Sequence, residues 1–339
     1  MQYRIFGRSG LRVSELCLGT MSFGTEWGWG SDKEESKKVF DTFAGAGGNF
    51  LDTANRYTEG TSERWLGEFV KSDRHHFVLA TKYTLRDQSG DLNFAGSHRK
   101  NMMRSVEESL RRLDTDFIDL FWVHAWDAFT PVEEVMRGLD DLVRAGKVLH
   151  IGVSDTPAWV ISQSNTLADL RGWTPFAGIQ IEYSLLQRPA ERELLPMAKA
   201  LGLAITPWGA IGGGVLTGKY LKKESGRVPE HSARRTERAN TIAAKVVEVA
   251  ERTGIAPVQV AINWTRQRDP SLNVIPLIGA SRAAQLKETL GCLDNPLPAD
   301  AIAQLDAVSA IELGFPHDFL RSDNVRELVY GGLYSHLKS

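Results

Sequence analysis

The sequence has little cysteine and no excess of either charge. Its 339 residues include two cysteines, Cys17 and Cys292, too few for a disulfide framework or a cysteine-based zinc site. The eight histidines show no metal-ligand spacing, so no metal is expected. Lysine and arginine number 40 and aspartate and glutamate 42, which gives a formal net charge of −2. A dedicated nucleic-acid binder normally has a basic excess, so no nucleic-acid partner is expected.

A continuous apolar segment that could cross a membrane is also lacking. The longest uncharged run, residues 200–218, contains Pro207 and six glycines, which argue against a spanning helix. The first residues, MQYRIFGRSG, have no apolar core of the kind found in secretory signals. We therefore expect no membrane partner and a cytoplasmic, reducing location.

The sequence does contain a regular alternation of short apolar runs and amphipathic stretches. The runs predict strands over residues 16–18, 49–52, 77–81, 117–123, 148–153, 179–182, 203–206 and 273–277. The amphipathic stretches predict helices over 33–46, 62–70, 98–113, 131–145, 157–170, 189–201, 241–253, 257–268, 282–290 and 299–311. Strict β–α alternation implies a parallel sheet with right-handed crossovers. Eight such units favour a closed (β/α)8 barrel, with an open doubly wound sheet as the alternative.

The remaining organisation is simple. Residues 3–13 predict a small β-hairpin ahead of the barrel, placed where it could plug the N-terminal mouth. We find no low-complexity linker, composition shift or internal repeat. The sequence therefore predicts one domain over residues 1–339.

Polar residues at the ends of successive predicted strands form the candidate site. In parallel α/β barrels the active site lies at the C-terminal ends of the strands. Asp52, Lys82 and His124 stand at three such ends, and Tyr57 lies in the loop after Asp52. Each alone has a plain structural explanation, such as a turn cap, a solvated lysine or a core histidine. Together they form a coherent set for proton transfer.

Carbonyl reduction needs these residue types. The oxygen that receives a proton needs an acid, and tyrosine can serve when its pKa of about 10 moves toward neutrality. A nearby lysine cation favours that shift, and an aspartate can hold the lysine in place. A neutral histidine can donate to the carbonyl oxygen and orient it.

These residues lie in segments that resemble the aldo-keto reductase family along nearly the whole chain. The segments are GRSGLRVSELCLGTMSFG, LDTANRY, LATK, VHAWD, GVSD, IQIEYSLL, TPWGAIGGGVLTGKY and IPLIGASRAAQLKETLG, in order. TPWGAIGGGVLTGKY most resembles the branch of potassium-channel β subunits and bacterial general reductases. The resemblance implies a (β/α)8 barrel with a C-terminal tail that covers the substrate. It also implies NADPH or NADP⁺ as cofactor and a small-molecule carbonyl compound as substrate.

The resemblance also implies roles for individual residues. Tyr57 would be the general acid, tuned by Lys82 and Asp52, and His124 would orient the substrate. The nicotinamide would be held by Thr20, Met21, Asp52, Ser154, Asp155, Gln180 and Trp208. The pyrophosphate would lie along Gly209, Ala210, Ile211, Gly212, Gly213 and Lys219. The adenosine end would meet Gly279, Ser281, Arg282, Gln285, Glu288 and Thr289, where Arg282 beside Ser281 favours a 2′-phosphate.

Aromatic residues suggest the substrate pocket. Trp27 and Trp29 follow the first barrel strand and Trp126 the fourth, so an apolar or bulky carbonyl compound is expected. The sequence departs from the family at Asp155, where many members have Asn, at Gly209–Ala210, usually Ser-Pro, and at Thr289, commonly Asn. These departures concern the cofactor segments.

Other functions stay open. The chain could be an NADP(H)-binding regulatory or redox-sensing subunit with little turnover. A barrel isomerase or aldolase could use Lys82 as a Schiff base. The sequence does not decide whether the chain forms a homo-oligomer.

Overall fold

The computed structural model describes residues 1–222, 224, 226, 228–229 and 231–337. An antiparallel hairpin of β1 (Tyr3–Ile5) and β2 (Arg12–Ser14) comes first. The parallel sheet is made of β3 (Cys17–Gly19), β4 (Phe50–Asp52), β5 (Val78–Tyr83), β6 (Ile118–Val123), β7 (Val148–Ser154), β8 (Gly178–Glu182), β9 (Ala204–Trp208) and β10 (Leu277–Ile278). The sheet order β10-β3-β4-β5-β6-β7-β8-β9 follows the chain, with β10 returning beside β3.

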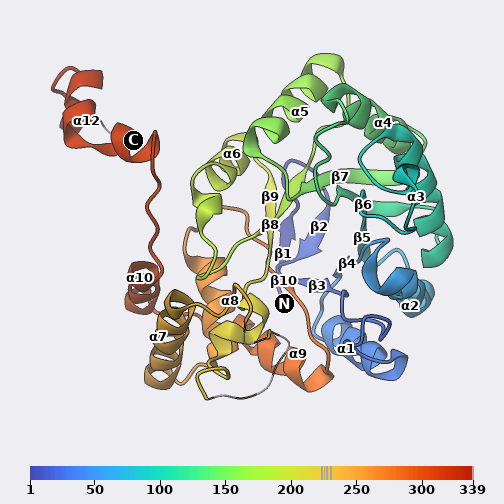
Figure 1. The fold of residues 1–339 in the computed structure, drawn as a ribbon, viewed down its shortest axis with the longest axis horizontal. Coiled ribbons are helices and arrows are strands. Elements are labelled where there is room, and N and C mark those ends of the chain that lie inside the picture. Colours follow the sequence, from blue (N-terminus) through green and yellow to red (C-terminus); the bar gives the residue numbers. More distant parts are fainter. Residues whose placement is uncertain (223, 225, 227, 230, 338–339) are drawn as a thin grey trace.

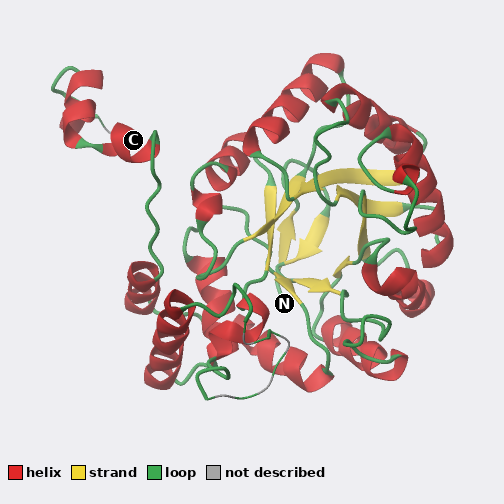
Figure 2. Ribbon diagram, viewed as in Figure 1, coloured by secondary structure: helices red, strands yellow, loops and turns green. Residues whose placement is uncertain are grey.

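Hydrogen bonds between Ile205 and residues 273 and 275 connect β9 to the segment before β10, which brings the two ends of the sheet together. Helices surround this sheet (Figure 1, Figure 2). They are α1 (Lys33–Gly45), α2 (Thr61–Val70), α3 (Arg99–Leu113), α4 (Val132–Arg144), α5 (Ala158–Arg171), α6 (Leu194–Leu201), α7 (Glu237–Thr253), α8 (Pro257–Gln267), α9 (Ala283–Leu290) and α10 (Ala299–Val308). The predicted (β/α)8 barrel and the predicted hairpin are confirmed.

Local sequence explains where several helices begin. The Asp32 side chain accepts a hydrogen bond from the backbone N–H of Glu35 and so caps α1. The predicted helices 131–145 and 157–170 begin with a proline. In the structure Pro131 and Pro157 are instead the N-cap residues of α4 and α5, one position before the first helical residue. The predicted helix 189–201 is interrupted: Pro189–Glu191 forms a 3-10 turn, and α6 starts at Leu194.

The hairpin closes the N-terminal end of the barrel. Phe6, which follows β1, is fully buried and lies edge-on to Phe50 and Trp122, with ring centroids 5.7 and 6.1 Å away. A Cβ at Gly178 would lie 2.5 Å from the Phe6 ring, so this strand position requires glycine. The opposite end of the barrel, where the strands terminate, is left for the site.

The long uncharged run does not form one helix. Residues 200–218 are divided among the end of α6, strand β9 and a 3-10 segment, η5 (Gly212–Thr217). In the described part of the chain, no helix has both the length and the apolar character needed to span a bilayer. The same residues contain no group of three or more histidine, cysteine or acidic side chains placed to hold a metal ion.

The C-terminal tail differs from our expectation. After α10 the chain leads away from the barrel, and α11 (His317–Arg321) and α12 (Asp323–Val329) lie apart from it (Figure 1). Phe315 is 84% exposed. The predicted C-terminal tail that covers the substrate is therefore not found in this structure, where the tail lies away from the barrel. The physical reason is that most of its large apolar side chains are exposed, and the core cluster includes no described residue beyond Val308.

Candidate active site

A fully buried lysine lies at the centre of the site. Lys82 is near the end of β5, and its Nζ donates to the carboxylate of Asp52, at the end of β4. The same Nζ lies 2.8 Å from the backbone oxygen of Thr53 and 3.0 Å from the hydroxyl oxygen of Tyr57. Adjacent parallel strands thus bring together three of the predicted residues.

The lysine stays charged in this environment. Burial alone would lower the pKa of Lys82, but Asp52 and Tyr57 oppose this effect and the net pKa is raised. Burial raises the pKa of Asp52, while the Lys82 cation and a hydrogen bond from Gln180 act in the other direction. A Schiff base requires a neutral amine, so this geometry argues against the aldolase alternative.

Tyr57 keeps its proton in this structure. It begins a 3-10 segment, η1 (Tyr57–Gly60), and the Lys82 Nζ lies 4.6 Å from its ring centroid. Burial raises the pKa of Tyr57 above 10.0, and Lys82 offsets this only in part. Our expectation of a pKa drawn toward neutrality is therefore wrong, because desolvation outweighs the lysine charge. A protonated phenol remains suited to donate its proton during carbonyl reduction.

His124 completes the cluster as a neutral ring. It follows β6, and its backbone N–H donates to the carbonyl of Tyr83 at the end of the adjacent strand. The ring lies edge-on to Tyr57, with centroids 5.8 Å apart. Burial, with the Lys82 charge, holds the pKa of His124 well below 6.5. Its buried Nδ1 has no hydrogen-bond partner among the described residues.

One tryptophan lies beside the tyrosine, and a second tryptophan lies beside the first. Trp27 lies edge-on to Tyr57 with ring centroids 6.4 Å apart, and 5.7 Å from the Trp29 ring. The Trp27 indole N–H donates to Glu59, and the Arg56 guanidinium lies 5.4 Å from the indole ring. These contacts place an aromatic wall next to the predicted acid. Trp126, the third predicted substrate residue, is half-buried and packs against the apolar core.

Most of the predicted nicotinamide residues also meet near this end of the barrel. The Gln180 amide donates to Asp52 Oδ1 over 3.0 Å, and Ser154 pairs with Gln180 in adjacent strands. The Trp208 indole donates to Asp155 over 3.2 Å, and burial raises the pKa of Asp155.

Asp155 has φ +42°, a conformation that asparagine and aspartate tolerate better than most residues. On the opposite side of the site, the Thr20 hydroxyl bonds to the Asp52 carbonyl and to Ser62, and Met21 is half-buried.

The segment predicted to hold the pyrophosphate has a glycine-dependent backbone. Gly209, Gly212 and Gly213 all have positive φ, while Ala210 is buried and Ile211 precedes η5. A Cβ at Gly214, also at positive φ, would lie 3.0 Å from the Nζ of Lys219. The absence of that Cβ lets the lysine lie against the loop, so the loop offers both a cation and close backbone approach, as phosphate binding requires.

The predicted adenosine residues form a separate cluster around β10 and the start of α9. The Ser281 hydroxyl and Gln285 Oε1 lie 3.2 Å apart, and Gly279 follows β10. Arg282 is an exposed N-cap of α9 and has no ion-pair partner in the described residues. Glu288 is exposed on α9, whereas Thr289 is buried. The residues present fit a phosphorylated nucleotide, because an unpaired arginine adjoins a hydroxyl at a helix start.

An ion pair that the sequence did not predict lies across the site. Glu182, at the end of β8, pairs with Arg234 over 2.9 Å, and the Arg234 guanidinium lies 5.9 Å from the Trp208 ring. Glu182 could have been found, because it lies two residues after Gln180 and so shares its side of the strand. No sequence pattern around Arg234 indicated that this residue would lie at the site. With Gly212 and Arg238, the pair lines a cavity of about 270 Å³.

The comparisons with known proteins agree with this geometry. The model of the Aldo/keto reductase family matches residues 15–310. The chain is 42% identical to a norsolorinic acid reductase of Emericella nidulans, over 92% of this chain and 82% of the relative. It is 38% identical to an aryl-alcohol dehydrogenase [NADP(+)] of Phanerodontia chrysosporium, over 91% and 86%, and 37% identical to a putative aryl-alcohol dehydrogenase of Saccharomyces cerevisiae, over 93% and 88%.

The family model covers most of the chain, and these relatives are matched over more than four-fifths of their own length. The predicted family is therefore confirmed, and this chain belongs to the aldo/keto reductase family.

Proposed function

We propose that the chain catalyses NADPH-dependent, reversible reduction of an aldehyde or ketone, with Tyr57 as the proton donor. The observation that carries the proposal is the 3.0 Å contact between the Tyr57 hydroxyl and the Lys82 ammonium, next to a neutral His124. Membership of an oxidoreductase family supports the reaction class.

Each residue of the site has a separate role in the proposed reduction. A bound nicotinamide would supply or accept the hydride. Tyr57 Oη donates its proton to the carbonyl oxygen as negative charge develops there. Lys82 stabilises the phenolate that remains, and Asp52 keeps Lys82 in place. His124 orients the carbonyl oxygen by donating a hydrogen bond from its neutral ring.

NADPH is the proposed cofactor. Arg282 and Ser281 offer a cation and a hydroxyl to a 2′-phosphate, and Lys219 lies against the glycine-rich loop for the pyrophosphate. The name of the Phanerodontia relative, which includes NADP(+), supports the same choice. A cytoplasmic location agrees with two buried, unpaired cysteines.

The proposed substrates are aromatic carbonyl compounds and the matching alcohols. Several relatives are named as aryl-alcohol dehydrogenases or norsolorinic acid reductases. The edge-on contact of Trp27 with Tyr57 provides an aromatic surface where such a ring would lie.

A titration tests the cofactor first. Quenching of tryptophan fluorescence by NADPH and by NADH should give a lower dissociation constant for NADPH. Aromatic aldehydes should then cause loss of the near-ultraviolet absorbance of NADPH. Tight NADPH binding without turnover on any carbonyl compound would instead support a redox-sensing subunit. Absence of saturable binding by either nucleotide would reject the reductase.

A further inference from the structure

The C-terminal arm, residues 310–337, carries many apolar side chains that the barrel does not cover. Nine of its large apolar residues are between 40% and 84% exposed. They are Phe315, Phe319, Leu320, Leu328, Val329, Tyr330, Leu333, Tyr334 and Leu337. Val325 is the one buried side chain of the arm, all of which is described. The arm therefore exposes the apolar surface that a protein normally buries.

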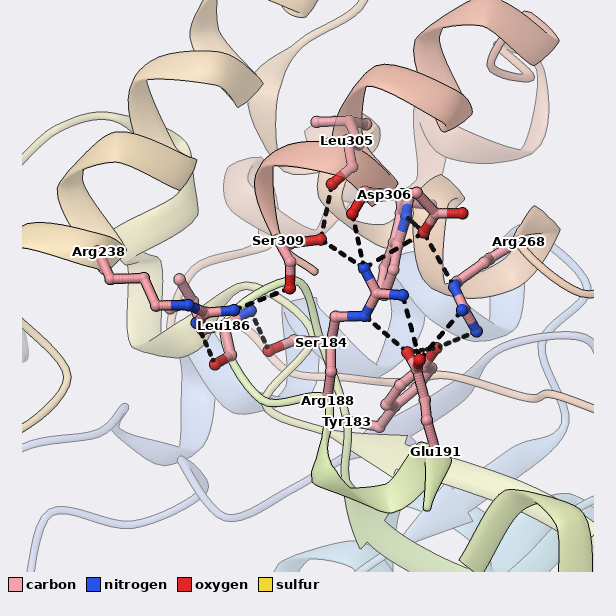
Figure 3. Close-up of polar contacts among 11 residues, drawn as sticks. Tyr183, Ser184, Leu186, Arg188, Glu191, Arg238, Arg268, Leu305, Asp306 and Ser309 are labelled. Carbon is pink, nitrogen blue, oxygen red and sulfur yellow. Dashed lines mark hydrogen bonds and ion pairs between the residues drawn. The ribbon is translucent and has the colours of Figure 1, made fainter. Parts of the chain in front are cut away.

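The direction of the arm is fixed at its base. Arg188 donates to the Ser309 hydroxyl over 2.9 Å, and Arg238 donates to the Ser309 carbonyl over 2.8 Å, as Figure 3 shows. Arg188 is itself held by Glu191, which also binds Arg268. Ser309 is thus held by the loop between β8 and α6, through Arg188, and by the start of α7, through Arg238, at the point where the arm begins.

Two further contacts continue this path along the barrel edge. Arg192 donates to the backbone oxygen of Glu312 over 2.9 Å, and His317 lies 3.0 Å from the carboxylate of Glu193. Beyond them α11 and α12 extend away from the barrel (Figure 1). The anchored base points the arm outward, where its apolar side chains require a second surface.

The amount of exposed apolar surface suits a stable dimer. An aromatic side chain has about 150–250 Å² of surface, so Phe315, Phe319, Tyr330 and Tyr334 alone expose roughly 450 Å², and the five exposed aliphatic residues add to this area. The largest apolar patch on a typical monomer is only about 300–600 Å². Each partner in a standard stable interface buries about 800 Å². An arm of this area is large enough to hold two chains together.

The barrel itself carries a matching apolar rim. Leu92, Phe129 and Trp159 are 93%, 97% and 69% exposed. They follow the C-terminal ends of β5, β6 and β7, which are neighbours in the sheet, so all three lie on the side of the barrel that carries the active site. The arm leaves beside the start of α6, in the next β–α unit.

We propose that two copies of this chain exchange their C-terminal arms, and that each arm packs on the apolar rim formed by Leu92, Phe129 and Trp159 of the other copy. A two-fold axis makes the exchange reciprocal, so both arms and both rims are covered. Because the rim borders the active-site end of the barrel, each arm also covers the substrate opening of its partner.

Light scattering coupled to size-exclusion chromatography tests the exchange. The wild-type chain should have twice the 37.6 kDa mass of one chain. The double variant Leu328→Asp/Leu333→Asp should run as a monomer, with unchanged circular dichroism. On the rim, Trp159→Gln should weaken the dimer at least tenfold. Leu170→Gln is the matched control, because Leu170 is an 80% exposed leucine at the other end of the same helix.

Cross-linking then decides which chain receives the arm. A mixture of unlabelled and ¹⁵N-labelled protein should give arm-to-rim links between differently labelled chains. Links confined within one chain would show that the arm folds onto its own barrel and would overturn the proposal. A monomeric wild-type chain at tens of micromolar, or a dimer that persists in the double variant, would also overturn it.

Discussion

Gln180 donates its side-chain amide to Oδ1 of Asp52 over 3.0 Å, and this hydrogen bond crosses the barrel interior. The two residues lie on β8 and β4, which are four positions apart in the eight-stranded sheet and therefore on opposite sides of the barrel. Lys82 holds the same carboxylate from β5. The position of Asp52, and through it the position of the Lys82 ammonium, thus depends on three strands.

Removal of this hydrogen bond should therefore destabilise the fold. Gln180→Leu leaves a buried carboxylate oxygen without one donor, which should lower the free energy of unfolding by about 1–3 kcal/mol. Urea denaturation measures the change. Gln163→Leu, at an exposed position on α5, is the control and should change it by less than about 0.5 kcal/mol. Equal effects of the two substitutions would show that the Asp52 contact has no special importance.

Tyr57→Phe tests the proton donor. Loss of the hydroxyl should lower kcat for carbonyl reduction by at least about 100-fold, because general acid catalysis contributes about that much or more. NADPH affinity, followed by fluorescence quenching, should change less than twofold. Tyr3→Phe, on the hairpin at the closed end of the barrel, should leave kcat unchanged. Near-wild-type turnover by Tyr57→Phe would assign the proton to another group.

The neutral His124 should make the fold less stable in acid. Burial depresses the pKa of His124 in the folded state, so below its ordinary value of 6.5 the unfolded chain binds a proton that the folded chain does not. The free energy of unfolding should therefore fall as pH decreases through 6.5. Between pH 7.5 and 5.5 wild type should lose about 1 kcal/mol more than His124→Gln, as measured by urea denaturation. Parallel losses in the two proteins would indicate a solvated, protonatable ring.

Arg282→Ala tests the choice of nucleotide. If Arg282 binds the 2′-phosphate, its removal should raise the dissociation constant of NADPH at least about tenfold, since a hydrogen bond to a charged group contributes about 1.5–3 kcal/mol. The constant for NADH, which lacks that phosphate, should change less than twofold. Lys287→Ala removes a charge from the exposed face of the same helix and is the control. Equal weakening of both nucleotides would place Arg282 elsewhere.

The sequence was sufficient to predict the (β/α)8 barrel and to predict that the four catalytic candidates lie close together. Apolar runs recur at each strand, and the parallel order forces Asp52, Lys82 and His124 to one end of the sheet. It was insufficient where distant segments meet. Nothing local to Arg234 predicts its pairing with Glu182, 52 residues away.

The acidity of Tyr57 and the path of the tail could not be read from the sequence either. Residue types near Tyr57 indicate which charges act on its pKa, but not how deeply the ring is buried, and burial decides the direction of the shift. The sequence shows aromatic residues such as Phe315 in the tail, yet the direction of the tail is set by contacts such as that of Arg238 with the Ser309 carbonyl.

Trp27→Ala tests the aromatic wall beside the predicted acid. Trp27 lies edge-on to Tyr57, so an aromatic substrate whose carbonyl reaches the tyrosine hydroxyl should contact this indole. Loss of such a contact, at about 0.5–1.5 kcal/mol, should raise KM for aromatic aldehydes roughly five-fold and leave KM for short aliphatic aldehydes unchanged.

Steady-state kinetics on both classes makes the comparison, with Trp173→Ala as a control because Trp173 follows α5 at the opposite end of the barrel. A fall in kcat that is the same for every substrate would contradict a substrate contact. It would show instead that the indole acts by holding Tyr57 in position.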